Sequence, residues 1–295
     1  MIDEAALRAA FESRTGRPLG DFRLAPLSGG CINHAFRLDA DGARFFVKSN
    51  DHHLPGHFES EARGLEAMRA SGTSLHVPEV VTWVDDPRGT SFLVLEYLEP
   101  GRRVADFDDR LGRGLAELHG ASDTRGFGFE IDGYCGATSQ PNRWSSSWTE
   151  FYAERRLLHQ ARLAASRGLP KSDVGLVERL ARRLGDWLDD DPVSPSALVH
   201  GDLWSGNVHV DAEGRPALLD PAAYFAHREA EFGMMALFGS FSSRVYEVYQ
   251  DHSPLAPGWR QRLDLYVVYH LLNHFVLFGG DYGRQAIARV RHYVA

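Results

Sequence analysis

Cysteine and lysine are both scarce in this sequence, with two of each among 295 residues. Two cysteines, Cys31 and Cys135, cannot build a disulfide framework, so a reducing compartment and a cytoplasmic location are expected. Long apolar runs are also missing. The most apolar late segment, residues 265–278, is interrupted by polar side chains and is shorter than the ~20 residues that span a bilayer. The first residues are acidic rather than basic and apolar, so no signal peptide is expected.

Excess positive charge is absent as well. The formal net charge is −8, and no basic run offsets it, which argues against a nucleic-acid partner. The 14 histidines show none of the clustered spacing that is typical of a zinc site. With 43% hydrophobic and 24% charged residues, the chain has the composition of a globular protein. Its length allows one large domain or two closely packed lobes.

The spacing of apolar residues changes near residue 97. Before this point, short runs with turn residues between them predict mainly strands, whereas later segments have the period of helices. The expected helices cover residues 2–14, 58–70, 148–167, 171–189 and a segment from 260 onward, and the expected strands lie near residues 24–27, 35–38, 44–48, 77–83 and 91–98. This predicts an α+β fold of two lobes. The β-rich N-lobe would cover residues 1–97 and the mainly helical C-lobe residues 98–295, with a linker at Glu96–Gly101.

The segment from His200 to Asn207 carries the clearest chemical pattern, His-Gly-Asp-Leu-Trp-Ser-Gly-Asn. Two short apolar runs follow it and end at Asp220, so a hairpin is expected to bring Asp202, Asn207 and Asp220 together. The five-residue step from Asp202 to Asn207 equals that of the catalytic loop of kinases. A carboxylate at Asp202 could take the proton of an acceptor hydroxyl, and Asn207 and Asp220 could bind Mg²⁺. Each could also be an ordinary turn residue, but their combination favours a site.

A kinase also needs a strand lysine paired with a helix carboxylate. Lys48 ends an expected strand, and the other lysine, Lys171, lies in a Pro-Lys-Ser loop. Glu61 shares a helix face with Leu65 and Met68, so it should point inward. The alternatives are an edge-strand lysine and a partly buried surface acid.

A glycine pair lies between the first two expected strands, in Ser28-Gly29-Gly30-Cys31-Ile32-Asn33. We expect this loop, with Ser28, Gly29, Gly30 and Asn33, to cover the phosphates of a nucleotide. It matches neither the glycine-rich loop of protein kinases nor the P-loop. Backbone groups of Glu96, Tyr97 and Leu98 would meet the adenine at a hinge between the lobes.

Taken together, these residues resemble the fructosamine kinase (ketosamine kinase) family, within the aminoglycoside-phosphotransferase-like branch of the kinase fold. The resemblance covers nearly the whole chain. It rests on residues 200–207 with their tryptophan, 220–222 with Tyr224 and 227–231, 127–129 with 136–142, and 58–62 before Gly64. The chain departs from the family at two places that carry none of the expected catalytic groups. Ala226 stands where members often have glycine, and Gly133-Tyr134-Cys135-Gly136 replaces the usual Asn-x-Ile-Gly.

The resemblance implies transfer of the ATP γ-phosphate to a sugar hydroxyl, O3, of a glycated amine. The phosphate ester then decomposes and frees the amine, which is a deglycation repair. It also implies that Trp204 contacts the substrate, although packing beneath the loop is an equal alternative. Cys31 could form a redox-sensitive bridge between two subunits of a homodimer, or simply fill a hairpin.

Two other interpretations stay open. A kinase of the same branch could act on an aminoglycoside, choline or homoserine with the same catalytic groups. A pseudokinase could bind a nucleotide without turnover, but the presence of Lys48, Asp202, Asn207 and Asp220 together argues against it. The sequence does not identify the sugar or the amine.

Overall fold

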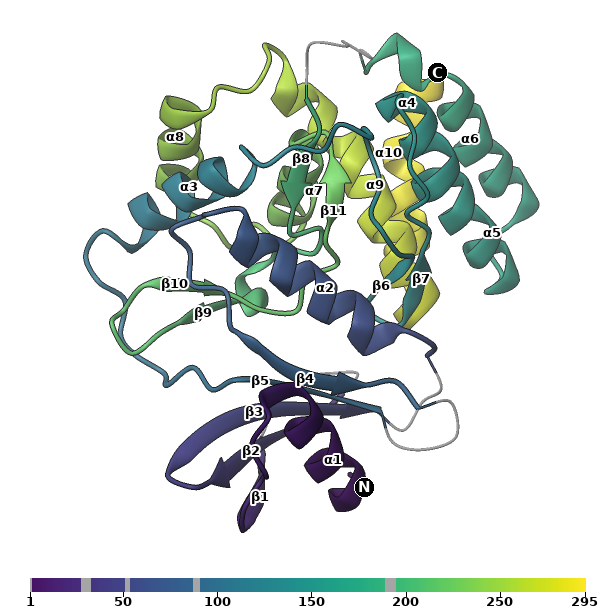
Figure 1. Cartoon of the computed structure of the whole chain (residues 1–295). Coiled ribbons are helices and arrows are strands. Elements are labelled where there is room, and N and C mark those ends of the chain that lie inside the picture. The colour runs from purple at the N-terminus through teal and green to yellow at the C-terminus, as the bar shows by residue number, and fades with distance from the viewer. Residues whose placement is uncertain (1, 28–32, 51–53, 87–90, 189–194) are drawn as a thin grey trace.

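The computed structural model describes residues 2–27, 33–50, 54–86, 91–188 and 195–295 (Figure 1). Its N-terminal part is one antiparallel sheet with the strand order β1-β2-β3-β5-β4. The strands are β1 (Phe22–Leu27), β2 (His34–Ala40), β3 (Ala43–Asn50), β4 (Val80–Val84) and β5 (Ser91–Glu96). Helix α1 (Glu4–Thr15) packs against this sheet over Leu7 and Phe11. The predicted helix and strands of this part are confirmed.

The turn between β2 and β3 shows how the local sequence sets the sheet register. Ala40 pairs with Ala43, so only Asp41 and Gly42 form the turn, and both have positive φ, 51° and 76°. An Asp-Gly pair with this geometry matches the right-handed twist of the two strands. The register that follows places Lys48 opposite Ala35 on one side and Leu93 on the other.

Helix α2 (His57–Ala70) lies between the sheet and the helical part of the molecule (Figure 1). Its buried face carries Phe58, Ala62, Leu65 and Met68 at helical spacing, together with the acidic Glu61. Because an α-helix repeats every 3.6 residues, this spacing turns Glu61 toward the interior with its apolar neighbours.

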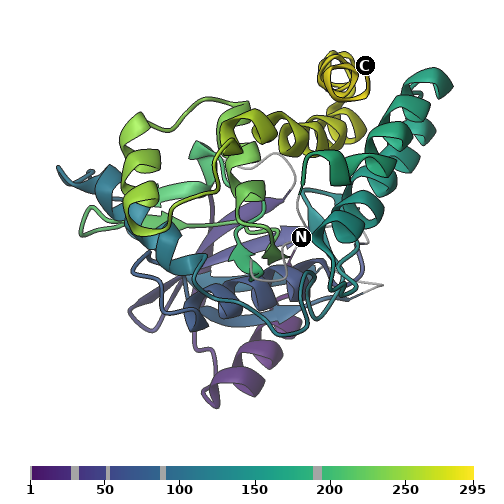
Figure 2. The same ribbon diagram turned by 90° about the horizontal axis from the view of Figure 1, so that it is seen from above.

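The rest of the chain is mainly helical. Its helices are α3 (Phe107–Leu118), α4 (Trp148–Phe151), α5 (Leu158–Ser166), α6 (Lys171–Arg182), α7 (Glu229–Leu237), α8 (Ser243–His252), α9 (Trp259–Phe278) and α10 (Tyr282–Val294). Three small hairpins or strand pairs join them: β6 (Gly133–Cys135) with β7 (Thr138–Gln140), β8 (Ala197–Val199) with β11 (Tyr224–Ala226), and β9 (Val208–Val210) with β10 (Pro216–Leu218). Figure 2 shows α1 and α10 at opposite sides of the molecule.

Three predicted helices differ in detail from the structure. The helix expected over 148–167 contains a π-helical stretch, Tyr152–Leu157, between α4 and α5. The helix expected over 171–189 ends as an α-helix at Arg182, and a 3-10 turn covers Leu184–Asp186. The helical segment after 260 breaks at Gly279 and Gly280, whose φ angles of 70° and 65° separate α9 from α10.

The π-helical stretch places Arg156 entirely inside the protein. The guanidinium donates from Nη1 to the carbonyl oxygen of Pro141 at 2.7 Å and from Nη2 to Oδ1 of Asn142 at 2.8 Å. Its carbon lies 4.0 Å from the centre of the Tyr224 ring. Arg156 therefore ties the segment before α4 to strand β11.

Two apolar cores hold these elements together. The smaller one lies between α1 and the sheet and includes Leu7, Leu38 and Val47. The larger one contains the buried face of α2, Leu93 and Leu95 of β5, and the interior of the helical part. The lobe boundary near residue 97 stays a prediction. Among the described residues, no helix is long and apolar enough to cross a membrane.

Candidate active site

Lys48 lies at the centre of the site, on strand β3 and 6% exposed. Its Nζ is 2.7 and 2.9 Å from the two carboxylate oxygens of Glu61 on α2 and 2.8 Å from Oδ1 of Asp220. Burial lowers the pKa of this ammonium, but the two carboxylates more than offset burial, so the pKa lies above its usual value. Lys48 therefore stays protonated, and its ion pairs link strand β3 to helix α2 and to the Asp220 segment of the C-terminal part.

Asp220 follows strand β10 and precedes Pro221. Its φ of 58° lies in the left-handed region, which asparagine and aspartate adopt more readily than other non-glycine residues. This unusual backbone aims a half-exposed carboxylate, 49% accessible, at Lys48. Burial of its inner part raises the pKa of Asp220, but Lys48 outweighs this effect and keeps the pKa below its usual value.

The loop after β8 is shaped by Gly201 and Glu231. Gly201 has a φ of 81°, and a Cβ at this position would lie 2.2 Å from the carbonyl oxygen of Ala222. The buried carboxylate of Glu231, on α7, accepts hydrogen bonds from the backbone N–H groups of His200 at 2.5 Å and Gly201 at 3.1 Å. His200 also contacts the carbonyl oxygen of Leu219 through Nε2 at 2.8 Å. Buried partners thus hold this loop beside the Asp220 segment.

Asp202 and Asn207 are connected within the same loop. Nδ2 of Asn207 donates to the backbone oxygen of Asp202 at 2.8 Å, and the backbone oxygen of Asn207 accepts from Leu219 N at 3.0 Å. The expected hairpin of β9 and β10 therefore brings Asp202, Asn207 and Asp220 into one region. Burial, together with the charges of Asp220 and Glu231, raises the pKa of Asp202 to about 8.

Trp204 is one of the most exposed large apolar residues of the described chain, at 39%. Its ring covers Gly206, where a Cβ would lie 2.3 Å from the indole. On its other side Phe238, 42% exposed, lies with its ring centre 6.0 Å away. Phe238 could not be predicted as a site residue, because an aromatic residue just after a helix is usually part of the core.

The remaining predicted site residues lie on the sheet. Oδ1 of Asn33 accepts from Nδ2 of Asn50 at 2.8 Å, just before β2. Glu96 ends β5, and its carboxylate contacts His76 and the N–H of Glu79. Tyr97 and Leu98 follow directly and are partly buried. Ser28, Gly29, Gly30 and Cys31 lie outside the described residues.

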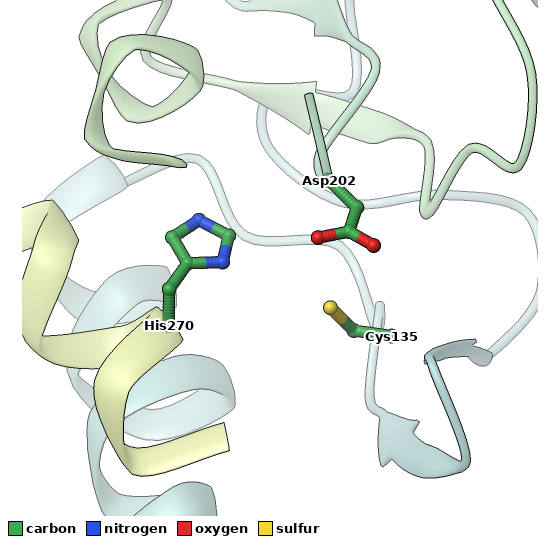
Figure 3. A group of neighbouring side chains, drawn as sticks. All are labelled: Cys135, Asp202 and His270. Carbon is green, nitrogen blue, oxygen red and sulfur yellow. The ribbon is translucent and has the colours of Figure 1, made fainter. Parts of the chain in front are cut away.

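Sequence reasoning missed Glu231, which holds the loop, and also Cys135 and His270, which lie beside Asp202 (Figure 3). Glu231 belongs to a recognised segment, residues 227–231, but nothing in the pattern shows which acid turns inward. Cys135 and His270 come from β6 and α9, so only the tertiary fold brings them to Asp202.

Comparisons with known proteins show the family to which the chain belongs. The family model described as fructosamine kinase matches residues 5–295. A Synechocystis protein named "Probable ketoamine kinase" is 43% identical over 272 residues, covering 92% of this chain and 90% of that protein. The chloroplastic protein-ribulosamine 3-kinase of Arabidopsis thaliana is 39% identical over 273 residues, covering 92% of this chain and 82% of that protein.

Solved structures show the same similarity in three dimensions. A candidate fructosamine-3-kinase from Thermobifida fusca superposes with a TM-score of 0.84 at 34% identity, covering 98% of both chains. The aminoglycoside phosphotransferase APH(4)-Ia, a thermostable mutant, superposes with a TM-score of 0.61 at 17% identity, covering 97% of this chain and 98% of that one. The second match shows the fold alone. The chain is therefore a kinase of the fructosamine kinase family, built on the aminoglycoside-phosphotransferase fold.

Proposed function

We propose that this protein uses Mg·ATP to phosphorylate the sugar part of a ketosamine, at O3. One observation carries the chemistry: Lys48 is held between Glu61 and Asp220, at 2.7 and 2.8 Å, next to the loop that presents Asp202. The substrate class is supported by the relatives, which are named as kinases of ketoamines and ribulosamines.

Asp202 is assigned the role of general base. The acceptor hydroxyl loses its proton to this carboxylate while its oxygen bonds to the γ-phosphorus, and the bond from that phosphorus to the ADP oxygen breaks. A general base works best when its pKa lies near the operating pH. The pKa of about 8 at Asp202 meets this condition, whereas an exposed aspartate, with a pKa of ~3.9, would be a weak base.

Asp220 and Asn207 are assigned to Mg²⁺. Their donor set fits a hard cation, because Asp220 offers a half-exposed carboxylate and the amide nitrogen of Asn207 is occupied by the oxygen of Asp202, which leaves its amide oxygen as the ligand atom. When bound, the ion would supply positive charge to the phosphates. The low pKa of Asp220 keeps its carboxylate ionised for this role.

Lys48 and Glu61 are assigned to the nucleotide phosphates. Glu61 is buried and accepts from Lys48 through both oxygens, so it fixes the direction of the ammonium. In the same proposal, the loop with Ser28, Gly29, Gly30 and Asn33 covers the phosphates. The backbone of Glu96, Tyr97 and Leu98 meets the adenine. The side chain of Glu96 is already engaged with His76, which agrees with a role for its backbone only.

Trp204 and Phe238 offer the acceptor an aromatic surface. Both rings are exposed and their centres lie 6.0 Å apart, with Trp204 in the loop of Asp202 and Phe238 at the end of α7. An indole face can stack on a sugar or on a protonated secondary amine, a contact of about 0.5–2 kcal/mol. The proposed phosphate ester is unstable and releases the free amine, so the biological role would be the repair of glycated amines in the cytoplasm.

The test is a phosphorylation assay with Mg·ATP and a panel of fructosyl-, ribulosyl- and erythrulosyl-lysine, with an aminoglycoside and choline alongside. We expect a ketosamine phosphate ester at O3, located by phosphorus NMR, and the same amine set free afterwards. Asp202→Asn should lose this activity by ~10²–10⁴-fold. Asp186→Asn, in an exposed 3-10 turn, is the matched control and should behave as wild type.

Each other result would change the proposal in a defined way. Turnover of choline or the aminoglycoside without ketosamine turnover would keep the kinase and refute the repair role. Nucleotide binding without any Mg²⁺-dependent turnover would indicate a pseudokinase. Full activity of Asp202→Asn would remove Asp202 from the role of base.

A further inference from the structure

Three side chains from distant parts of the chain meet beside the catalytic loop. Cys135 ends strand β6, Asp202 lies in the loop after β8, and His270 lies in the middle of α9. Their sulfur, oxygen and nitrogen atoms all lie within 4.8 Å of one another. Figure 3 shows the thiol, the carboxylate and the imidazole turned toward a common space. The proposed phosphoryl transfer uses only Asp202 of these three.

The two buried groups of this set, His270 and Cys135, differ in their partners. His270 is 4% exposed, and its Nδ1 has no hydrogen-bond partner in the part of the chain that the structure describes. Buried polar atoms are nearly always paired, so an unpaired imidazole nitrogen in this place points to a missing ligand. Cys135 is a buried free thiol, and Nδ2 of Asn273 lies 3.3 Å from its sulfur.

The chemistry of the three atoms selects a particular class of metal. Thiolate, imidazole and carboxylate are ligands of Zn²⁺, whereas Mg²⁺ prefers oxygen alone. Zinc bonds of ~2.0–2.3 Å place the ligands of a tetrahedron ~3.5 Å apart, which these side chains reach by movements of about 1 Å. The Asn273 amide supplies the hydrogen bond to sulfur that commonly supports a metal thiolate.

We propose that Cys135, Asp202 and His270 form a zinc site that inhibits the enzyme when it is occupied. Binding replaces the S–H bond of Cys135 by a sulfur–zinc bond and releases the proton to solvent. Three protein ligands leave the fourth position of a tetrahedral ion free for water, and Asp202 is the partly exposed member of this set. A zinc-bound Asp202 can no longer accept the proton of an acceptor hydroxyl. The inhibition therefore rests on the proposed role of Asp202, whereas the binding does not.

Co²⁺ provides a test of binding that is independent of turnover, because a cobalt thiolate has a strong charge-transfer absorption in the near ultraviolet. The chain has only two cysteines, so in Cys31→Ser any such band must report Cys135. We expect one equivalent of Co²⁺ to give the band in wild type and in Cys31→Ser, and Zn²⁺ to remove it by displacement. The band should vanish in Cys135→Ser, and the affinity should fall by ~10–100-fold or more in His270→Gln.

Two controls locate the ion. Asp220→Asn changes the proposed Mg²⁺ ligand and should keep the cobalt band, and His274→Gln, one helical turn after His270, should keep it too. If the wild-type protein shows no cobalt band, the site is refuted, and this result does not depend on whether any variant folds. Equal affinity in His270→Gln, or loss of the band in Asp220→Asn, refutes this set of ligands. Melting curves establish that each variant is folded, and Cys135→Ala replaces Cys135→Ser if the latter is not.

Inhibition is measured separately, with Mg·ATP in excess. Micromolar Zn²⁺ should reduce ketosamine phosphorylation in wild type, and a zinc-selective chelator should restore it. In Cys135→Ser the zinc concentration for half inhibition should rise by ~10–100-fold. Equal sensitivity of both proteins would show that zinc acts through ATP and would refute the inhibition. If neither protein phosphorylates any ketosamine, the proposed function fails, and the cobalt spectra still decide whether the site exists.

Discussion

Replacing Glu61 by glutamine tests whether the buried ion pair holds the site together. Glutamine keeps the shape of the side chain but removes the charge that faces the Lys48 ammonium at 2.7 and 2.9 Å. Both side chains are about 7% exposed, so water cannot replace the lost partner. Breaking one side of a buried ion pair costs ~3–5 kcal/mol.

Asp220 limits this loss, because it still faces Lys48 at 2.8 Å and is half exposed. We therefore expect Glu61→Gln to lower the free energy of unfolding by about 3 kcal/mol, the lower end of that range. For a chain of this length, this corresponds to a melting temperature lower by roughly 6 °C. Because Lys48 would also lose its fixed direction, kcat/KM should fall by about 10²-fold.

The same helix offers a matched control. Glu66 lies on α2 and pairs with Arg14 at 3.0 Å, but these side chains are 33% and 50% exposed. Exposed pairs contribute only ~0.2–1 kcal/mol, so Glu66→Gln should change the melting temperature by no more than about 2 °C. Urea titration followed by circular dichroism measures both variants, and ADP release measures activity. If Glu61→Gln costs no more than Glu66→Gln, the ion pair does not organise the site.

Four further predictions follow from other contacts. Trp204→Ala should raise KM for the ketosamine by about 2- to 30-fold and leave KM for ATP unchanged in steady-state assays, since stacking contributes ~0.5–2 kcal/mol; an unchanged ketosamine KM would leave packing as its role. Gly201→Ala should destabilise the protein by at least ~1–3 kcal/mol in thermal melts, because its φ of 81° and the close oxygen of Ala222 leave no room for a Cβ. Burial raises the pKa of Glu231, but its contacts with His119 and His200 lower the pKa by more, so it lies below its usual value. The stabilising effect of this carboxylate is therefore complete above the unfolded pKa of ~4.3 and is lost as the pH falls through the lower pKa of the folded state. Glu231→Gln should accordingly flatten the acid side of the profile of stability against pH. If Cys31 is a redox switch, reductant should change activity and dimer fraction in wild type but not in Cys31→Ser, and equal behaviour of the two proteins would end that idea.

Local patterns predicted the groups that belong to one element or to neighbouring ones. Lys48 could be placed because it ends an apolar strand, and Glu61 because it repeats with Leu65 and Met68. The β9–β10 hairpin could be placed because two short apolar runs flank a turn. In each case the period of a helix or strand decides which side chains point inward.

The contacts between distant elements could not be predicted in this way. No spacing rule brings Cys135 and His270 to Asp202, and the absence of zinc-like spacing along the chain says nothing about residues that meet only in the folded protein. The π-helical stretch was also unforeseen, because the apolar period of residues 148–167 is that of an ordinary helix.

That π-helical stretch makes the number of residues in its segment a structural constraint, in addition to the identity of its buried residues. A π-helical turn is closed by an i→i+5 hydrogen bond and so contains one residue more than the i→i+4 turn of an α-helix, and Arg156 on this stretch donates to Pro141 and Asn142. Deleting a single residue from Tyr152–Leu157 would restore an α-helix and rotate everything after it by ~100°. The buried face of α5 would then turn to solvent. A change in the number of residues should therefore be as damaging here as the loss of the buried Tyr152, Arg156 or Leu157.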